Sequence, residues 1–489
     1  MQPIDFSKIL HELTYQPESP IIFSSGLFLY LFVAFLAVYS MVYKNERLRI
    51  YFLIAFSIFF YYKSSGLYFL LLIGLALVDY TLARIMGNTE NKKTRKFLLI
   101  TSLSVNLGML GYFKYTNFLF SSFYELINQP FDPFNIFLPV GISFFTFQSL
   151  SYTFDVYRGN IKPLKSLSEF AFFVTFFPQM VAGPIVRAVD FIPQIKGTPH
   201  VSKEDFGRAI FLICSGLFKK AVISDYISLN FVDRIFDNPT LYTGFENLMG
   251  VYGYALQIYC DFSGYSDMAI GIALLLGYKL ALNFDSPYQS ASITEFWRRW
   301  HISLSSWLRD YLYISLGGNR KGKIRTYFNL MITMLLGGLW HGAALRFVIW
   351  GALHGAMLAI EKFFKSIVKV PQNKLTRFFG VVLTFHFVCF CWIFFRADNM
   401  EVVGAVLSQI FTSFHPEVVG EFINGYSLVS GLMLLGFVLH FMPSKIEKIT
   451  EKAVATSPFA LKVLYLSLII FLVIQIKSSE IQPFIYFQF

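Results

Sequence analysis

The sequence predicts an all-α, polytopic integral membrane protein with about 11 to 13 membrane segments. Of its 489 residues, 55% are hydrophobic and 15% are charged, and the mean hydropathy is +0.55. A soluble chain carries roughly a quarter charged residues, so most of this chain's surface must face lipid. The 58 Phe and 28 Tyr suit wide apolar helix faces and interfacial belts.

Apolar runs long enough to cross a bilayer recur along the whole chain. They cover residues 21–43, 48–62, 67–85, 97–120, 134–154, 170–186, 208–231, 248–282, 327–345, 347–364, 378–395, 426–441 and 461–476. Gly183-Pro184 and Pro139-Val-Gly141 interrupt two of them, as buried irregular backbone does, so some segments must be paired, broken or re-entrant. With no internal repeat or low-complexity linker, we expect a single membrane domain over 1–489, ending in a span and tail over 458–489.

Charge predicts the orientation in the membrane. Residues 1–20 carry three acidic side chains against one lysine, whereas 44–49 and 84–96 are basic, as are 320–325, 362–377 and 445–452. The positive-inside rule places the basic segments in the cytoplasm and the acidic stretch 398–421 outside. We therefore expect a multi-pass protein of the inner (plasma) membrane with both termini extracytoplasmic. No basic region precedes an apolar core at the N-terminus, which argues against a cleavable signal peptide.

The net charge of +11 thus mostly reflects the basic loops that are expected to orient the chain in the membrane. The bases are spread over many short loops, which argues against a nucleic-acid partner. The four cysteines lie in apolar runs without metal spacing, and no His-Glu-x-x-His pair exists, so we expect no metal site.

Two Trp-His pairs are the candidates for chemistry. Trp340-His341 lies in an uncharged run between Arg325 and Arg346, where an ionisable side chain is costly unless its neighbours solvate it. The surrounding glycines let another backbone or a ligand approach closely. A neutral imidazole can accept a proton from a hydroxyl, and a histidine hydrogen-bonded within a helix bundle is the structural alternative. For His354, His386 and His440, which also lie in apolar runs, the structural interpretation is favoured.

Trp300-His301 lies on a predicted amphipathic helix. Ser292-Ile-Thr-Glu295 fits a capping box, so a helix begins there. Trp297, His301, Leu304 and Leu308 fall on one face at helical spacing, and Arg298, Arg299 and Arg309 lie at its edge or opposite. We expect this helix to lie at the cytoplasmic interface, either as a simple anchor or as part of a site that includes His301.

Two further stretches stay open. In the loop Gly317-Gly-Asn-Arg-Lys-Gly-Lys323, glycine N–H groups and basic side chains are able to hold phosphate, although an ordinary positive-inside loop is favoured. In Asp261-Phe-Ser-Gly-Tyr-Ser-Asp267, two carboxylates interrupt an apolar run. They either orient a catalytic histidine or pair with an arginine that holds helices together.

Several stretches together resemble the membrane-bound O-acyltransferase family, in particular its bacterial branch that O-acetylates exported polysaccharides such as alginate. They are Gln179-Met-Val-Ala-Gly-Pro-Ile-Val186, Gln257-Ile-Tyr-Cys-Asp-Phe-Ser-Gly-Tyr-Ser-Asp-Met268, Asn283-Phe-Asp-Ser-Pro-Tyr288, Glu295-Phe-Trp-Arg-Arg-Trp-His-Ile-Ser-Leu-Ser305 and Gly338-Leu-Trp-His-Gly342. The resemblance runs from about residue 100 to the C-terminus, with a core over about 100–445, and the Phe-Trp-Arg-Arg-Trp-His element with a later Leu-Trp-His is highly specific.

The resemblance implies a helix bundle around a central tunnel, with His341 as the essential histidine. His301 matches the family's second position and would position the thioester or stabilise the oxyanion. The donor would be cytoplasmic acetyl-CoA, with no permanently bound cofactor. It would contact Trp300, Arg298, Arg299, Asn319, Arg320 and Lys321. The expected partners are a periplasmic esterase-like (SGNH) acetyltransferase and the polysaccharide synthesis machinery.

The C-terminal tail adds a further candidate. Phe484-x-Tyr486-x-x-Phe489 is similar to a C-terminal motif of bacterial acyltransferase systems of this type, in which the tyrosine carries the acyl group onward. A phenol is a better leaving group than an alkyl alcohol, so a tyrosyl ester keeps much of its transfer potential. An aromatic interfacial anchor is the alternative.

At the level of the whole protein, an acyltransferase is one hypothesis, and an exporter or flippase of polysaccharide or lipid-linked sugar is the other. Many spans and broken helices also fit a transporter. A glycosyltransferase lacks an evident cytoplasmic nucleotide-sugar domain. The polymer that is acylated, and acetyl against a longer acyl chain, stay open.

Overall fold

The computed structural model describes residues 11–17, 20–368, 371, 373–476 and 484. Within these residues the chain forms helices joined by loops and has no β-strand, which confirms the all-α prediction. Contacts divide the chain into two compact units. Unit 1 runs to Ser202 and includes Ile272–Ala281, and unit 2 contains Lys203–Gly271 and the described residues from Leu282 onward.

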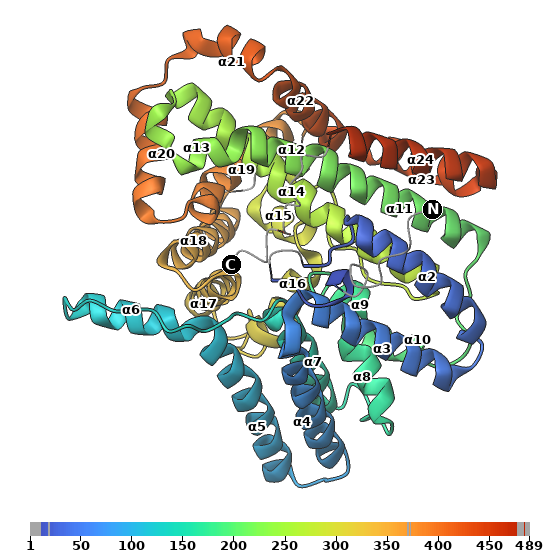
Figure 1. Cartoon of the computed structure of the whole chain (residues 1–489). Helices are drawn as coiled ribbons and strands as arrows, with labels where there is room; N and C mark the ends of the chain where they lie inside the picture. The colour runs from blue at the N-terminus through green and yellow to red at the C-terminus, as the bar shows by residue number, and fades with distance from the viewer. Residues whose placement is uncertain (1–10, 18–19, 369–370, 372, 477–483, 485–489) are drawn as a thin grey trace. The chain divides into compact units, whose positions relative to one another are not determined.

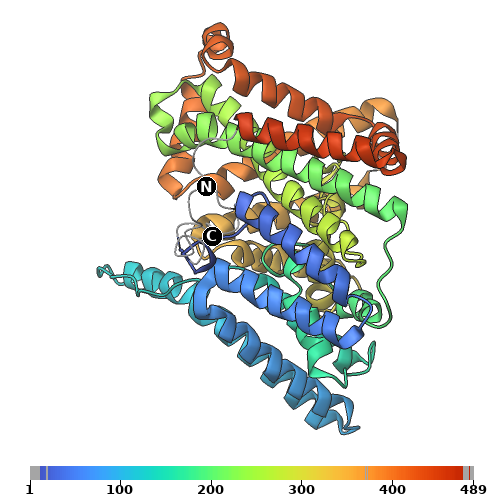
Figure 2. The same cartoon turned by 45° about the vertical axis from the view of Figure 1, so that its right-hand side comes forward.

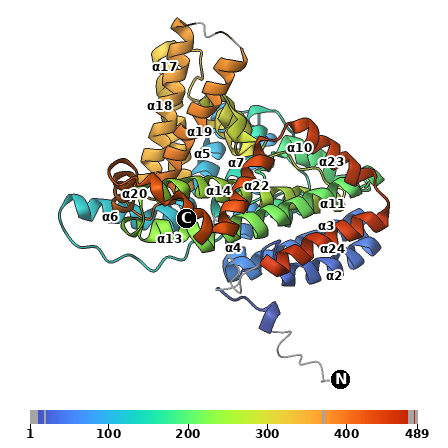
Figure 3. The same ribbon diagram turned by 90° about the horizontal axis from the view of Figure 1, so that it is seen from above.

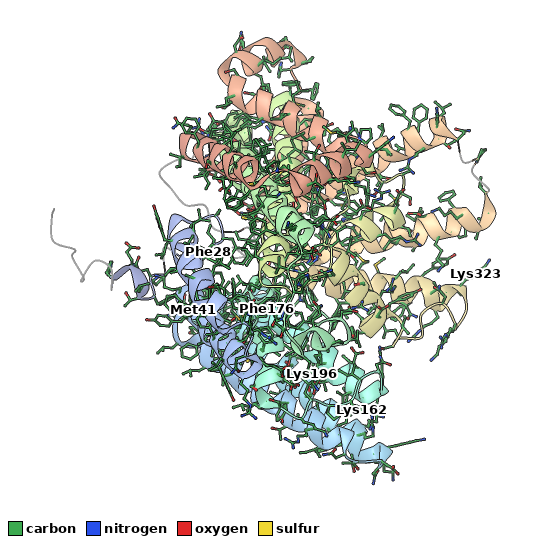
Figure 4. All side chains as sticks on the ribbon, turned by 90° about the vertical axis from the view of Figure 1, so that its right-hand side faces the viewer. Phe28, Met41, Lys162, Phe176, Lys196 and Lys323 are labelled. Atoms are coloured by element: carbon green, nitrogen blue, oxygen red, sulfur yellow. The ribbon has the colours of Figure 1, made fainter. Side chains whose placement is uncertain are left out.

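Unit 1 is built around packed phenylalanine rings. The ring of Phe177 lies 5.0 Å from that of Phe56 and 5.6 Å from that of Phe35, and Phe176 sits among densely packed side chains (Figure 4). Its helices are α2 (Gly26–Val42), α3 (Glu46–Ser65), η1 (Gly66–Tyr68), α4 (Phe69–Gly87), α5 (Lys92–Leu110), η2 (Gly111–Tyr115), α6 (Thr116–Leu126), α7 (Ile142–Arg158), α8 (Leu167–Thr175), α9 (Phe177–Met180) and α10 (Ala188–Ile195).

Unit 2 carries both Trp-His pairs, around α16 and at the end of α17 (Figure 1). Its helices are α11 (Lys203–Leu217), η3 (Phe218–Ser224), α12 (Asp225–Ile227), η4 (Ser228–Val232), α13 (Asp233–Asp237), η5 (Pro239–Leu241), α14 (Gly244–Leu275), η6 (Pro287–Gln289), α15 (Ile293–Arg299), α16 (Ile302–Trp307), η7 (Leu308–Tyr313), α17 (Lys323–His341), α18 (Leu345–Ile367), α19 (Lys374–Arg396), α20 (Met400–Thr412), η8 (Pro416–Val418), α21 (Val419–Gly425), α22 (Ser427–Phe441), α23 (Ser444–Thr456) and α24 (Phe459–Ile476).

Small residues let the helices of unit 2 approach closely. Helix α11 lies beside α23 and α24 (Figure 2), and a Cβ added at Gly207 would lie 2.4 Å from the Ala455 carbonyl oxygen. Helices α17 and α18 pack along one another (Figure 3), and a Cβ at Gly338 would lie 2.2 Å from the Phe347 oxygen. Gly338, three residues before His341, therefore lets another backbone approach closely, which is one of the two roles expected for the glycines around His341; the other was the approach of a ligand.

Some of the predicted membrane segments are continuous helices, and others are broken. Five described helical stretches are long and apolar enough to cross a membrane, namely Glu46–Gly87, Lys92–Leu126, Leu345–Ile367, Lys374–Arg396 and Phe459–Ile476, or up to seven if two bent pairs each count as one span. The prediction of 11 to 13 counted apolar runs, several of which are interrupted. Run 134–154 is helical only from Ile142 onward, and run 170–186 breaks between α8 and α9.

Candidate active site

The predicted amphipathic helix begins as expected but does not continue through His301. Ser292 caps α15, since its Oγ accepts the Glu295 N–H at 3.2 Å, while the Glu295 carboxylate accepts the Ala291 N–H at 2.9 Å. The helix ends at Arg299. Trp300 is extended, and His301 adopts the left-handed conformation at φ +44° before α16 begins. The prediction of one continuous helix over this stretch is therefore wrong.

Asn283 explains the break. Its backbone oxygen accepts the Ile302 N–H at 2.9 Å, and its side-chain Oδ1 accepts the Ser303 N–H at 3.2 Å and the Ser303 hydroxyl at 2.9 Å. These bonds satisfy the first N–H groups of α16, which have no partner within the helix. A non-glycine residue at positive φ costs about 1–3 kcal/mol and concentrates at functional sites. The partner that holds His301 there lies eighteen residues upstream.

The break brings the two Trp-His pairs together. The His301 and His341 rings lie 6.5 Å apart, and the two side chains are 0% and 3% exposed. Aromatic rings surround them. Phe262 of α14 lies 4.7 Å from His301, and Trp350 of α18 lies 5.1 Å from His341. Both histidines are thus buried in one aromatic environment within unit 2.

Burial determines the protonation of His301. Because its ring is removed from water, desolvation lowers the pKa of His301 to about 3. The ring is therefore neutral at physiological pH and keeps one lone pair on nitrogen.

The residues predicted to contact the donor lie in three places. Trp300 is 1% exposed and packs against the rings of Phe296 and Trp392, at 5.6 and 5.0 Å. On α15, Arg298 is exposed and Arg299 pairs with Glu295 at 3.0 Å. The third group lies in the turn between η7 and α17.

This turn is the basic loop, and it is exposed at Asn319, Arg320 and Lys321. The side-chain oxygen of Asn319 accepts from the Tyr313 hydroxyl and from Lys362 Nζ, the latter at 2.8 Å. Lys323, the first residue of α17, lies at the outer end of that helix (Figure 4). The structure therefore places this loop's basic groups at the surface of unit 2, and their contact with a donor stays a prediction.

Of the C-terminal motif, Tyr486 lies outside the described residues, but Phe484 is described. Its side chain is fully buried, and its ring lies 4.8 Å from that of Tyr265 and 5.6 Å from that of Phe262. Since Phe262 also packs on His301, Phe484 is separated from that histidine by one aromatic ring. The tail therefore reaches the candidate site at Phe484.

Sequence reasoning named Asn283, Phe262 and Phe484 only as members of motifs and gave none of them a role in the site. The contacts of Asn283 and Phe262 with His301 are long-range, so spacing did not show them. Their place in the motifs was the usable signal.

The carboxylates of the Asp-rich motif pair with lysines rather than with an arginine. Lys220 contacts Asp261 at 2.5 Å and Asp225 at 2.8 Å, and Lys219 contacts Asp267 at 2.7 Å. These bridges join α14 to η3 and α12. They support the structural alternative for this motif.

These features define a multi-pass helical membrane protein with a buried histidine pair. The chain belongs to the membrane-bound O-acyltransferase family, whose model matches residues 22–403, and it is an O-acyltransferase. It is 43% identical over 399 residues to a probable alginate O-acetylase of Pseudomonas aeruginosa, covering 80% of this chain and 75% of that protein. It is 36% identical to a peptidoglycan O-acetyltransferase of Helicobacter pylori, over 79% of each chain. A teichoic acid D-alanyltransferase of Bacillus subtilis is 32% identical over 53% of this chain and 68% of its own.

Proposed function

We propose that this enzyme moves an acetyl group from cytoplasmic acetyl-CoA to a hydroxyl of an exported polysaccharide. The observation that carries the proposal is the pair of buried histidines with rings 6.5 Å apart, in a chain similar to two O-acetylating proteins. The names of those relatives refer to two different polymers, alginate and peptidoglycan. What they share is the acetyl group, so acetyl is the group that we assign to this chain.

The chemistry follows from a base in a dry site. His341 accepts the proton of the attacking hydroxyl as its oxygen forms a bond to the thioester carbonyl carbon. The carbon–sulfur bond then breaks, and the imidazolium returns the proton to the departing thiolate, which leaves as CoA thiol. His301 positions the reacting groups. General base catalysis of this kind contributes about 10²–10⁴-fold, and a site without water strengthens every polar contact in it.

We further propose that Tyr486 is the first acceptor. The placement of Phe484 supports this step, because two residues span at most about 7 Å of extended chain. The phenol attacks acetyl-CoA, and the resulting tyrosyl ester keeps enough transfer potential to acetylate a second hydroxyl. A periplasmic esterase-like partner then moves the acetyl group to the sugar, which requires both termini to face the periplasm from the inner membrane. The exposed basic groups Arg298, Arg320 and Lys321 attract the anionic donor from the cytoplasm.

The test is transfer of radiolabel from acetyl-CoA in purified membranes without any transport gradient. In the wild-type protein the tail becomes labelled and label reaches the polymer, His341→Ala shows neither, and Tyr486→Phe loses the label on the tail together with the transfer to polymer. An exporter or flippase would show no labelling, and labelling of the His341→Ala protein at the wild-type rate would overturn the assignment of the base. Labelling of Tyr486→Phe at the wild-type level, with full transfer to polymer, would reject the relay alone.

A further inference from the structure

The orientation of the Asn283 side chain is fixed by its neighbours. Its Oδ1 accepts the Ser303 backbone N–H at 3.2 Å, and a backbone N–H is only a donor. Its Nδ2 donates to the Ser266 hydroxyl oxygen at 3.2 Å. Exchanging the amide oxygen and nitrogen would therefore place two donors against each other at Ser303. The atom that faces His301 is an oxygen.

This oxygen determines which nitrogen of His301 carries the proton. The distance between Oδ1 and Nδ1 is 3.1 Å, which is a hydrogen bond only if Nδ1 donates. The Ser303 hydroxyl is the other group near Nδ1, at 3.5 Å, but it is closer to Oδ1, at 2.9 Å, and has one proton to donate. In a neutral ring, a protonated Nδ1 leaves the lone pair on Nε2.

We propose that Asn283 is a positioning residue that holds His301 in the Nδ1–H tautomer, so that Nε2 accepts a hydrogen bond during acyl transfer. The inference rests on the proposed function in assuming that His301 takes part in the acetyl transfer. It decides between the two roles expected of His301, which are to position the reacting groups and to stabilise the oxyanion. A neutral ring with its proton on Nδ1 has no N–H on Nε2 to stabilise an oxyanion, but it can accept a hydrogen bond from another donor of the bound substrates, since the one proton of the attacking hydroxyl goes to His341.

Among the described residues, the neighbours of His301 include aromatic rings and one ion-paired carboxylate. From α17 it is faced by His341 and Trp340, with ring distances of 6.5 and 5.9 Å, and from α14 by Phe262. Asp261 precedes Phe262 on α14, but it forms an ion pair with Lys220 at 2.5 Å. Among these groups, His341 is the titratable side chain that faces the ring.

The Asn283→Asp substitution tests the proposal through a pH profile. A carboxylate still accepts from Ser303 and from Nδ1, but its charge stabilises the imidazolium and raises the pKa of His301 by about one to three units. Protonation then blocks Nε2 as an acceptor. Because His341 must also be unprotonated, we expect the acid limb of kcat/KM for acetyl transfer to steepen or to move to higher pH, with the rate recovering above it. Asn283→Leu, which cannot hold the tautomer, is expected to lose activity at every pH.

Asn247→Asp is the matched control, since Asn247 is a buried asparagine of α14 whose Nδ2 donates to the backbone oxygens of Pro239, Tyr242 and Thr243. It is expected to reduce stability without moving the acid limb. An acid limb unchanged in both position and slope in Asn283→Asp, or higher activity at low pH, would overturn the proposal, because a donating His301 gains from protonation. If the wild-type protein transfers no acetyl group, the proposed function fails instead.

A direct measurement covers the case in which these variants do not fold. In wild-type protein labelled with [¹⁵N]histidine, the nitrogen resonances that disappear in His301→Gln are expected to be those of a protonated Nδ1 and an unprotonated Nε2. The reverse assignment would overturn the proposal without any measurement of activity.

Discussion

Four histidines of unit 2 are almost completely buried, in two regions that differ in one respect. His301 and His341 lie around α16 and α17, while His354 and His440 lie on α18 and α22, and all four are between 0% and 5% exposed. All four rings also contact other aromatic rings. Neither burial nor aromatic packing therefore separates the candidate site from the rest of the core.

The direction of the hydrogen bond does separate them. His354 Nδ1 accepts from the Trp297 indole N–H at 3.3 Å, and His440 Nε2 accepts from the Tyr288 backbone N–H at 3.1 Å. A neutral imidazole has one acceptor nitrogen. In each of these two rings, that nitrogen already accepts a hydrogen bond from a neutral N–H. His301 instead donates from Nδ1 to Asn283, so its acceptor nitrogen is Nε2, on the other side of the ring. The direction of the hydrogen bond therefore separates His301, a positioning residue, from the two structural histidines.

The largest effect is expected at His341. We predict that His341→Gln lowers the initial rate of acetyl transfer from acetyl-CoA by about 10²–10⁴-fold, because glutamine cannot take up the proton. His440→Gln is the matched control, since its side-chain oxygen can replace Nε2 as acceptor for the Tyr288 N–H. Equal losses in the two variants, measured at equal amounts of folded protein, would erase the distinction between the two regions.

Local sequence patterns predicted the start of the site but not its centre. The Ser292 cap is encoded by residues three apart and is present. The helical spacing of Trp297, His301, Leu304 and Leu308 predicted a continuous helix, and the structure breaks it at His301. The bonds that stabilise the break come from Asn283, and a pattern of helical spacing carries no information on partners so far away in the sequence.

The same limit applies to the membrane segments. Composition was sufficient for the fold class, since the described chain is helical and contains several spans. Composition alone did not show where each apolar run breaks, as run 170–186 does between α8 and α9. The proximity of His301 and His341, forty residues apart, was implied by the family resemblance rather than by spacing.

A second prediction concerns stability in the structural region. His440→Leu leaves the buried Tyr288 N–H without its acceptor, which costs about 1–3 kcal/mol, while the site around His341 keeps its groups. We expect a lower midpoint of thermal unfolding in detergent and an unchanged transfer rate per folded molecule at low temperature. His440→Gln should recover most of the midpoint. A loss of rate without a loss of stability would instead assign His440 to the chemistry.

A smaller change is expected from removing the donor to His354. Trp297→Phe keeps most of the aromatic packing but deletes the indole N–H, so the net loss is one hydrogen bond, about 0.5–1.5 kcal/mol. The unfolding midpoint measures it. If the transfer rate fell as far as in His341→Gln, the aromatic layer of α15 and α18 would be part of the active site and not only its support.

The smallest effect is expected for Ser303→Ala, which tests which hydrogen bond determines the tautomer of His301. Ser303→Ala removes the hydroxyl that donates to Asn283 Oδ1 but leaves the Ser303 backbone N–H, which fixes the amide by itself. The tautomer of His301 is therefore expected to persist. The loss of one hydrogen bond, about 1 kcal/mol, corresponds to at most about a fivefold drop in kcat/KM, with the acid limb of the pH profile at its wild-type position. A shift of that limb in Ser303→Ala would mean that the hydroxyl, and not the amide oxygen, determines which nitrogen of His301 is protonated.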